Sequence, residues 1–267
     1  MKRKRVLITG GEGFIGRNLR EALPEVDVLD LKSGQDIRTF QIKKKYDIIY
    51  HLAAQTDIKK SFENPLESFS HNVLGTLKVL EYAKKTKAKI IFASSAAVYW
   101  PITPYGLQKR QCEEWLRYYW NFGVKSIVLR LFNVFGKYQE IANSGYSLVI
   151  SKFLKQKKEG KPFTIYGDGK QRRDFVGVDD VVEAMIRAGE YLEGRPYFLA
   201  LDIGSGKNYS VNDLAEMIYK NNKKVYLPFP YSEPKTTTTA NIIVNNKILK
   251  WQPKTNLEQW LKSQLYS

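Results

Sequence analysis

Short apolar runs alternate along the chain with longer segments in which apolar residues recur every three or four positions. The apolar runs predict strands near residues 5–9, 26–30, 46–52, 89–94, 125–131 and 198–203. The segments with helical spacing predict helices near residues 14–23, 65–86, 105–122, 147–158, 179–191 and 211–220. Strands that alternate with helices are typical of an α/β fold with a doubly wound parallel sheet.

The first predicted strand runs directly into a glycine-rich turn. Gly10, Gly13 and Gly16 have the spacing G-x-x-G-x-x-G, and a segment with helical spacing follows. Glycines let the backbone approach a diphosphate closely, and a helix N-terminus offers N–H groups and a positive dipole end. Three glycines alone would also suit a tight turn, but a strand, glycines and a helix in this order predict the dinucleotide site of a Rossmann-type domain.

The second predicted strand ends at an acidic residue, Asp30. An acid at this point typically pairs with the adenosine ribose hydroxyls and repels the extra phosphate of NADP, so NAD is the expected cofactor. An ordinary strand-end turn residue is the alternative interpretation, and Lys32 nearby would partly offset the acidic charge.

A tyrosine and a lysine stand four residues apart on the predicted helix 105–122. Tyr105 and Lys109 therefore lie on one face, where the ammonium favours the ionised phenol, a group with an ordinary pKa of about 10. Ser95, at the end of the preceding strand, can hydrogen-bond the same substrate hydroxyl. The spacing alone arises by chance on many helices, but with Ser95 and the glycine turn it predicts the removal of a proton from an alcohol while a hydride leaves the same carbon.

These residues resemble the extended short-chain dehydrogenase/reductase family, and most closely its NAD-dependent nucleotide-sugar epimerase/dehydratase branch, which includes UDP-glucose 4-epimerase. The resemblance covers nearly the whole chain. The segments that carry it are Thr9–Gly16, Asp36-Ile37, His51–Gln55, Asn72–Thr76, Ser94–Tyr99, Tyr105–Lys109, Arg130–Gly136, Tyr166–Gly169, Arg172–Val176 and Asp202–Gly206.

The resemblance implies a wider set of residues around bound NAD. They are Gly10, Gly13, Phe14, Ile15, Gly16, Asp30, Asp36, Ile37, Leu52, Ala53, Ala54, Asn72, Ser94, Tyr105, Lys109 and Phe132. Asn72 is expected to order the lysine through water or the backbone, with an ordinary helix N-cap as the alternative role.

The resemblance also implies a nucleotide-diphosphate sugar as the substrate, with UDP as the preferred carrier because it is the most frequent one in the branch. Ser95 is expected to contact the sugar and Asn133 a sugar-linked phosphate. Leu148 and Tyr166 match positions that line the nucleobase pocket of relatives, and plain core positions are the alternative for both.

One arginine is expected to clamp the diphosphate, because guanidinium geometry suits phosphate oxygens. Arg173 precedes an Asp-Phe pair as in the family, whereas Arg172 is a candidate only by adjacency. An ion pair with Asp174 or Asp179 is the alternative role for Arg173.

The implied reaction is inversion at C4 of the sugar through a transient 4-keto intermediate, with Ser95, Tyr105 and Lys109 as the catalytic residues. Relatives that dehydrate or decarboxylate nucleotide sugars carry an acidic residue just after the Ser95 position, where this chain has Ala96 and Ala97. A 4-keto-sugar reductase needs the same three residues and stays an alternative. A non-catalytic NAD-binding regulator is a second alternative, because fold alone does not settle function.

The family divides into two interleaved parts. By this resemblance, residues 1–136 with 173–203 are expected to form the NAD-binding domain, and residues 137–172 with 204–267 a smaller substrate-binding lobe.

Two further features follow from the family pattern. Helices near 65–86 and 105–122 are implied to pair with a second subunit as a four-helix bundle, so a homodimer is expected; packing on their own sheet is the alternative. Only residues 100–104 separate Tyr99 from Tyr105, where relatives usually have a longer loop beside the sugar pocket and a glycine in place of Trp100.

Composition narrows the remaining possibilities. The single cysteine, Cys112, excludes an internal disulfide and a Cys-rich metal site, and two histidines are too few for a His-based cluster, so no metal is expected. His51 ends a buried strand and is expected to be structural. The apolar run after the basic N-terminus, residues 6–8, is too short for a signal or membrane segment, so a cytoplasmic location is expected.

The chain carries 43 Lys and Arg against 27 Asp and Glu, a formal net charge of +16. Such a surface can attract nucleic acid, membranes or anionic small molecules. No stripe of interleaved aromatic and basic residues is present, so a solvated lysine-rich surface is favoured over nucleic-acid binding.

Overall fold

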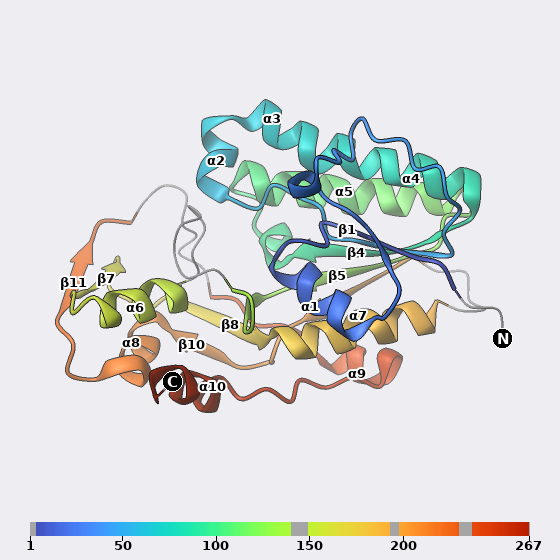
Figure 1. The fold of residues 1–267 in the computed structure, drawn as a ribbon. Coiled ribbons are helices and arrows are strands. Elements are labelled where there is room, and N and C mark those ends of the chain that lie inside the picture. Colours follow the sequence, from blue (N-terminus) through green and yellow to red (C-terminus); the bar gives the residue numbers. More distant parts are fainter. Residues whose placement is uncertain (1–3, 140–148, 193–197, 230–236, 267) are drawn as a thin grey trace.

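The computed structural model describes residues 4–139, 149–192, 198–229 and 237–266. Its centre is one parallel sheet whose strands are β1 (Val6–Thr9), β2 (Asp27–Leu29), β3 (Ile48–His51), β4 (Lys89–Ser95), β5 (Ser126–Leu131) and β9 (Phe198–Ile203). Their spatial order is β2-β1-β3-β4-β5-β9 (Figure 1). All six predicted strands are present, and the predicted doubly wound fold is confirmed.

Helices cover both faces of this sheet. Figure 1 shows α4 (Gly75–Thr86) and α5 (Pro104–Trp120) on one face, and α1 (Phe14–Ala22) with α7 (Val178–Tyr191) on the other. A short helix, α9 (Ile243–Leu249), packs beside α7. With both faces covered, the strands are nearly continuous apolar runs, and all four residues of β3 are buried.

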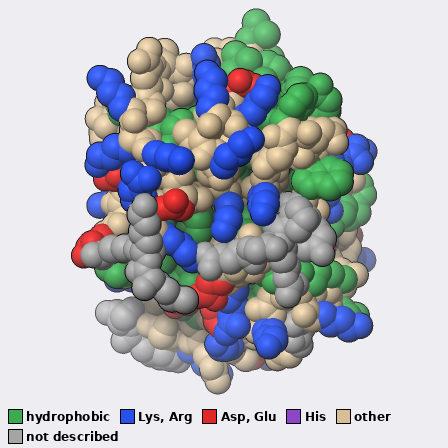
Figure 2. All heavy atoms as spheres, turned by 90° about the vertical axis from the view of Figure 1, so that its right-hand side faces the viewer, with side chains coloured by type: hydrophobic (Ala, Val, Ile, Leu, Met, Phe, Trp, Pro, Cys, Tyr) green, Lys and Arg blue, Asp and Glu red, His purple; other side chains and the backbone are tan. Residues whose placement is uncertain are grey.

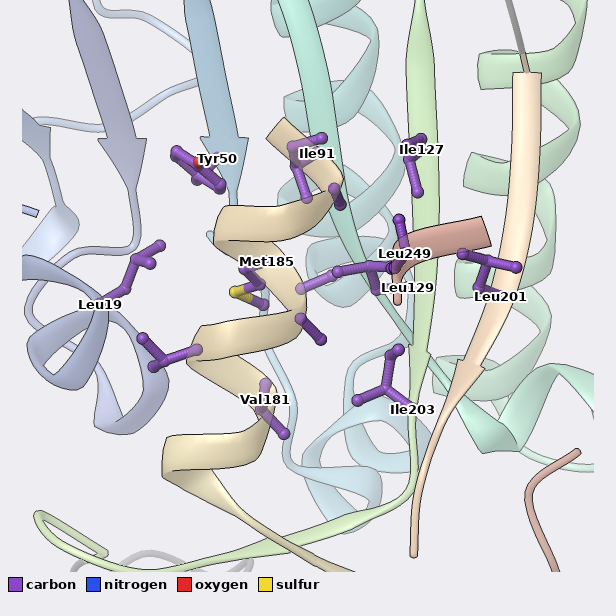
Figure 3. Packing of buried hydrophobic residues seen from close by; sticks show 14 of the residues in the cluster. Leu19, Tyr50, Ile91, Ile127, Leu129, Val181, Met185, Leu201, Ile203 and Leu249 are labelled. Carbon is purple, nitrogen blue, oxygen red and sulfur yellow. The ribbon is translucent and has the colours of Figure 1, made fainter. Parts of the chain in front are cut away.

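The packing between the sheet and α7 forms the larger apolar core. In Figure 3 the side chain of Met185 on α7 lies among Leu19 of α1 and Ile91 of β4, and Leu249 fills the space toward β5 and β9. These side chains are at most 4% exposed, so they contribute the hydrophobic burial that holds the helix layer on the sheet.

The prediction of one continuous α-helix over residues 65–86 is wrong. The segment consists of α3 (Pro65–Phe69), a π-helical turn over Ser70–Leu74, and α4. Asn64 caps α3 by accepting a hydrogen bond from the Glu67 amide, and Pro65 suits the first helical position. A π-turn inserts an extra residue and is frequent at functional sites.

A smaller lobe lies beyond the carboxyl ends of the sheet strands (Figure 1). It contains helices α6 (Val149–Lys158), α8 (Val211–Tyr219) and α10 (Leu257–Tyr266), and strands β6 (Asn133–Phe135), β7 (Phe163–Tyr166), β8 (Arg172–Gly177), β10 (Asn208–Ser210) and β11 (Lys224–Leu227). Its own apolar cluster includes Phe153, Phe163 and Leu214, all fully buried. The lobe also uses α10, which the sequence did not predict.

Lys and Arg side chains are numerous on the face at the amino edge of the main sheet (Figure 2). The loop before β3 carries Lys43 to Lys45, and the last turn of α4 with its C-cap carries Lys84, Lys85 and Lys87, at the amino edge of the sheet. Figure 2 shows Lys and Arg side chains across the right-hand side of Figure 1, where this edge lies. Among the helices of the described residues, none has the length and apolar character needed to cross a membrane.

Substitution of Trp251 tests the packing of the core that contains α7. The Trp251 side chain is 1% exposed, and its indole N–H donates to the Asp180 carbonyl at 2.9 Å. We expect Trp251→Ala to lower the free energy of unfolding by about 3–5 kcal/mol in urea titrations. Trp120→Ala, at a residue 49% exposed, serves as the control and should change it by about 0.5 kcal/mol or less. Equal effects of the two changes would contradict this packing.

Candidate active site

The glycine turn lies where the strand order reverses, between β1 and β3. Gly10 has a φ of +74°, and a Cβ there would lie 2.7 Å from the backbone nitrogen of Ala53, which follows β3. Only glycine permits this approach. Crevices at such reversals, beyond the carboxyl ends of the strands, are where open α/β sheets bind ligands.

The start of α1 suits a diphosphate. Its N-cap, Gly13, provides no side-chain acceptor, and the first turn contains no acidic residue. The N–H groups of Phe14, Ile15 and Gly16 therefore lack a capping side chain at this end of the helix. The residues present fit the phosphate part of NAD, and contact of the glycine turn with NAD stays a prediction.

Asp30 has a structural task in addition to its predicted one. Its carboxylate accepts hydrogen bonds from the backbone amides of Glu12, at 2.8 Å, and Lys32, at 2.9 Å. It thus holds the glycine turn against the end of β2 and is 7% exposed. Contact with a ribose remains a prediction.

Other residues predicted around NAD follow the same strands. Leu52 to Ala54 come directly after β3 and are half-buried, while Phe132 follows β5 and is 2% exposed. Asp36 forms an ion pair with Arg38 at 2.5 Å, and the hydrogen bond from that guanidinium lowers the pKa of Asp36 to about 2. Ile37 beside it packs into the core under α4.

Lys109 is the most constrained member of the predicted catalytic trio. Its side chain is buried at 3% exposure, and its ammonium donates to the Ala93 carbonyl of β4 at 2.8 Å. The same ammonium lies 4.6 Å from the centre of the Phe92 ring, within cation–π range. Burial lowers the pKa of Lys109 to about 8, while Cys112 and Glu113 act in the opposite direction.

Tyr105 lies on the same helix as Lys109, and Ser95 lies on the strand that the Lys109 ammonium contacts. Tyr105 is one helical turn before Lys109, 7% exposed, and its backbone N–H donates to Ser61 Oγ at 3.3 Å. Ser95 is the last residue of β4, and its hydroxyl accepts from the Ala97 amide at 3.2 Å. A Cβ on Gly106 would lie 2.8 Å from the Ala97 carbonyl oxygen, so this glycine lets the start of α5 pack on the turn after Ser95.

The two neighbours of this trio have partners of their own. Ser94, predicted near NAD, donates its hydroxyl proton to Glu113 Oε1 at 2.6 Å. Asn72 lies inside the π-turn, where it is hydrogen-bonded to the backbone of Gln55 and to the side chain of Gln108. The alternative role of Asn72 as a helix N-cap is therefore wrong, because Phe69 occupies that position.

His51 is structural, as expected. The Thr76 hydroxyl donates its one proton to the Asn72 carbonyl. In its contact with His51 Nε2, at 3.0 Å, the Thr76 oxygen must therefore be the acceptor, so Nε2 carries the proton of the ring. Nδ1 then accepts from the Thr9 hydroxyl at 2.7 Å. Burial lowers the pKa of this histidine to about 3, which keeps it neutral beside Lys109.

The predicted substrate residues are spread over the start of the smaller lobe. Asn133 opens β6 and donates to the Asp174 carbonyl at 2.7 Å, and Arg173 lies on β8, where its guanidinium donates to the Arg172 carbonyl at 2.9 Å. Tyr166 ends β7 beneath the ammonium of Lys152, 4.6 Å from its ring centre. Leu148 lies outside the described residues.

Arg172 and Asp174 have other partners. Arg172 is hydrogen-bonded to Asn208 and forms an ion pair with Asp213. The Asp174 carboxylate, fully buried, accepts from the backbone amides of Ser205, Gly206 and Ala240. Contact of Arg173 with a phosphate remains a prediction.

The short connection after Ser95 leaves aromatic surface at this edge. Tyr99 and Trp100 are each 42% exposed, with ring centres 5.9 Å apart, and Ile102 is 59% exposed. Thr103 then caps α5 by accepting from the Gly106 amide at 3.0 Å.

Sequence reasoning missed one buried carboxylate, Glu113. It follows Lys109 by four residues, so helical spacing on the same face was the available signal. It lies between Ser94 and Arg130, at 5% exposure.

Comparisons with known proteins identify the family of the chain. The model of the NAD dependent epimerase/dehydratase family matches residues 6–200. A UDP-glucuronate 4-epimerase of Thermodesulfobacterium geofontis is 30% identical over 88% of this chain and 76% of its own. The structure of a UDP-N-acetylglucosamine 4-epimerase from Methanobrevibacter ruminantium, in complex with UDP-N-acetylmuramic acid, is 30% identical with a TM-score of 0.90, covering 100% of this chain and 98% of that one. A UDP-glucuronic acid 4-epimerase from Bacillus cereus, in complex with UDP-glucuronic acid and NAD, is 27% identical with a TM-score of 0.86, covering 98% of each chain.

The buried ammonium makes a prediction about stability. The folded protein binds the Lys109 proton less tightly than the unfolded chain, where the pKa is 10.5, so the charge opposes folding below pH 8. We expect Lys109→Met to raise the free energy of unfolding at pH 7 by about 2–3 kcal/mol. The gain should shrink as pH rises from 8 to 10.5, because the unfolded chain then also loses the proton. Urea titrations at pH 7 and pH 10 measure it, and a gain independent of pH would contradict the argument.

Proposed function

This chain belongs to the NAD dependent epimerase/dehydratase family, and we propose that Ser95, Tyr105 and Lys109 perform its NAD-dependent inversion of C4 in a nucleotide-diphosphate sugar. One observation carries the assignment of these residues. The Lys109 ammonium, held at 2.8 Å by the Ala93 carbonyl, lies one helical turn after Tyr105 and against the strand that ends in Ser95.

Each side chain has a distinct task in this proposal. Bound NAD supplies reversible hydride exchange with C4 of the sugar. Tyr105 takes the proton of the 4-hydroxyl, and Ser95 donates a hydrogen bond to the same oxygen as it becomes a carbonyl. Lys109 has three N–H donors; one is used by Ala93, and we assign the others to the ribose of the cofactor. The 4-keto sugar turns over in the pocket so that the hydride returns to the opposite face of C4, and Tyr105 gives the proton back to the oxygen.

The charge on Lys109 supports the task of Tyr105. With a pKa of about 8, the side chain is mostly protonated at pH 7 and favours the phenolate of a tyrosine on the same helix face. Neutral His51 adds no competing charge behind it.

Inversion is favoured over dehydration or decarboxylation for a local reason. Residues Ala96 and Ala97 follow Ser95, so the turn offers no carboxylate to act as an acid or base. The buried Glu113 beside this strand is paired with Arg130 instead.

We assign substrate recognition to the smaller lobe, over residues 137–172 and 204–267, together with β6 and β8, which join this lobe to the rest of the chain. Arg173 is assigned to the diphosphate, Asn133 to a sugar-linked phosphate and Tyr166 to the nucleobase. UDP is our proposed carrier, because relatives of similar structure were solved with UDP-sugars. The short connection after Tyr99 suits a bulky sugar.

Incubation with UDP-, dTDP-, GDP- and CDP-sugars tests the function, with C4 inversion scored by chromatography. We expect inversion of at least one UDP-sugar, and we expect Tyr105→Phe to reduce kcat by about 1,000-fold or more while NAD stays bound, because a phenyl ring cannot transfer the proton. Tyr46→Phe is the control, since Tyr46 is equally buried but hydrogen-bonded to Asp27 beyond the site. Near-normal turnover by Tyr105→Phe would overturn the assignment.

We also propose that the chain forms a homodimer through α4 and α5. Leu107, Trp115, Tyr118 and Phe122 recur at helical spacing along one side of α5, or just after it, and are 39–52% exposed. Leu74, at the start of α4, is 44% exposed. An apolar stripe on neighbouring helices is suited to packing against a second copy of itself.

A charge within this stripe should separate the subunits. We expect Tyr118→Asp to halve the mass measured by light scattering after gel filtration, because each interface would then bury two carboxylates. Tyr219→Asp, at a similarly exposed tyrosine in the smaller lobe, should leave the mass unchanged. A wild-type protein that elutes as a monomer would rule the dimer out.

A further inference from the structure

Three polar residues form a row across the carboxyl edge of the sheet. In the strand register Ser94 of β4 is opposite Arg130 of β5, and Arg130 is opposite Asp202 of β9. Partners in register point to the same face of a sheet. Here that face is the one covered by α5, because Ser94 contacts Glu113 of this helix.

Glu113 joins two members of this row from above. Its Oε1 accepts the Ser94 hydroxyl at 2.6 Å, and its Oε2 accepts from Arg130 Nη2 at 2.7 Å. Arg130 Nε lies 3.1 Å from both oxygens. The carboxylate is buried, and a buried charge persists only when its partners replace water in this way.

The other end of Arg130 reaches the turn that follows Ser95. Its Nη1 donates to the Tyr99 hydroxyl at 3.0 Å, and its guanidinium lies 5.0 Å from the centre of that ring. Tyr99 in turn donates to Asp202 Oδ1 at 2.5 Å. The network therefore holds the chain immediately before Ser95, at Ser94, and shortly after it, at Tyr99.

The same network is fixed to the helix that carries the other two catalytic side chains. Tyr105, Lys109 and Glu113 follow one another at intervals of four residues on α5, so they lie on one helix face. A contact that fixes Glu113 therefore also fixes the position of this face. Lys109 is bonded to β4 at Ala93 and Glu113 at Ser94. Two consecutive turns of α5 are thus hydrogen-bonded to two consecutive residues of β4.

We propose that Glu113, clamped by Arg130, is a positioning residue that sets the separation between Ser95 and the Tyr105–Lys109 pair. The inference rests on the proposed function of those three residues. Proton transfer needs donor and acceptor within hydrogen-bond reach, and a displacement of about 1 Å can cost a factor of about 100 in rate. A neutral hydrogen bond could hold Ser94 alone. The charged pair also fixes Arg130, and through it the Tyr99 turn.

The charge of Glu113 has a second consequence for the site. Its carboxylate raises the pKa of Lys109 against the larger effect of burial. Removing that charge should let the lysine lose its proton at lower pH, which weakens its support of the Tyr105 phenolate.

The experiment compares Glu113→Gln with the wild type on an accepted sugar. We expect kcat to fall about 10- to 100-fold with KM changed less than about threefold, and the alkaline limb of the kcat–pH profile to move to lower pH. Glu183→Gln is the control, because it removes an ion pair with Arg187 on α7, and it should leave both readouts unchanged. Unchanged kcat and pH profile in an active, folded Glu113→Gln protein would reduce the pair to a purely stabilising role and overturn the inference.

A second pair of variants covers the case in which Glu113→Gln fails to fold. Ser94→Ala and Tyr99→Phe leave the Glu113–Arg130 ion pair in place and each remove one of its links to the Ser95 segment. We expect each to lower kcat about three- to tenfold, and wild-type rates in both would sink the proposal.

Hydrogen–deuterium exchange separates this inference from the proposed function. Faster exchange over residues 94–105 in Ser94→Ala, but not in Glu183→Gln, would support positioning whatever the reaction is. If the wild type inverts no sugar in the panel, the proposed function fails, and the exchange result still decides whether the network holds this segment. Unchanged exchange would count against it.

Discussion

The burial of one ammonium group constrains the centre of this protein. Lys109 is placed where water cannot solvate it, so the surrounding structure must supply a carbonyl at 2.8 Å and an aromatic ring at 4.6 Å. Both partners come from β4, which ties α5 to that strand at a defined height. The same burial lowers the pKa of the lysine to about 8, so it retains most of its charge at neutral pH, although no carboxylate of the described residues forms an ion pair with it. A carboxylate paired directly with the Lys109 ammonium would stabilise its charge further, but it would compete with the Tyr105 phenolate for that ammonium.

Two buried carboxylates at the same edge accept several hydrogen bonds each. Asp174 accepts from three backbone amides and a serine hydroxyl, and Asp202 accepts from Tyr99 and the Asn241 amide. Both carboxylates therefore attach the chain at Ala240 and Asn241 to strands of the sheet and of the smaller lobe. This fixed joint keeps β8, with its Arg173, beside the carboxyl edge where Ser95 and the glycine turn lie.

The lysine-rich surface and the proposed active site lie at different edges of the main sheet. Several of the lysines behind the net charge of +16 lie at the amino edge of the sheet (Figure 2), whereas the proposed catalytic trio lies toward its carboxyl edge. Screening over such a distance in salt leaves little of their field at the site. The proposed function therefore assigns attraction of an anionic nucleotide-sugar to Arg173 and the N-terminus of α1 rather than to the overall charge.

The sequence by itself determined the elements whose signals are local. Apolar runs located all six strands of the main sheet, glycine spacing located the turn after β1, and a four-residue interval put Tyr105 and Lys109 on one helix face. The ordered motifs also indicated the family. Breaks caused by backbone geometry were not visible, and the π-turn at Asn72 divided a helix whose apolar spacing looks continuous.

Only the tertiary structure decided how the polar groups are paired. Glu113, Arg130 and Tyr99 are far apart in sequence and meet because β4 and β5 run in register beneath α5. The role of Asp174 as an acceptor for backbone amides likewise depends on loops 31 and 66 residues away. A hydrogen bond needs atoms within about 3 Å, and no sequence pattern specifies that distance between segments brought together only by the fold.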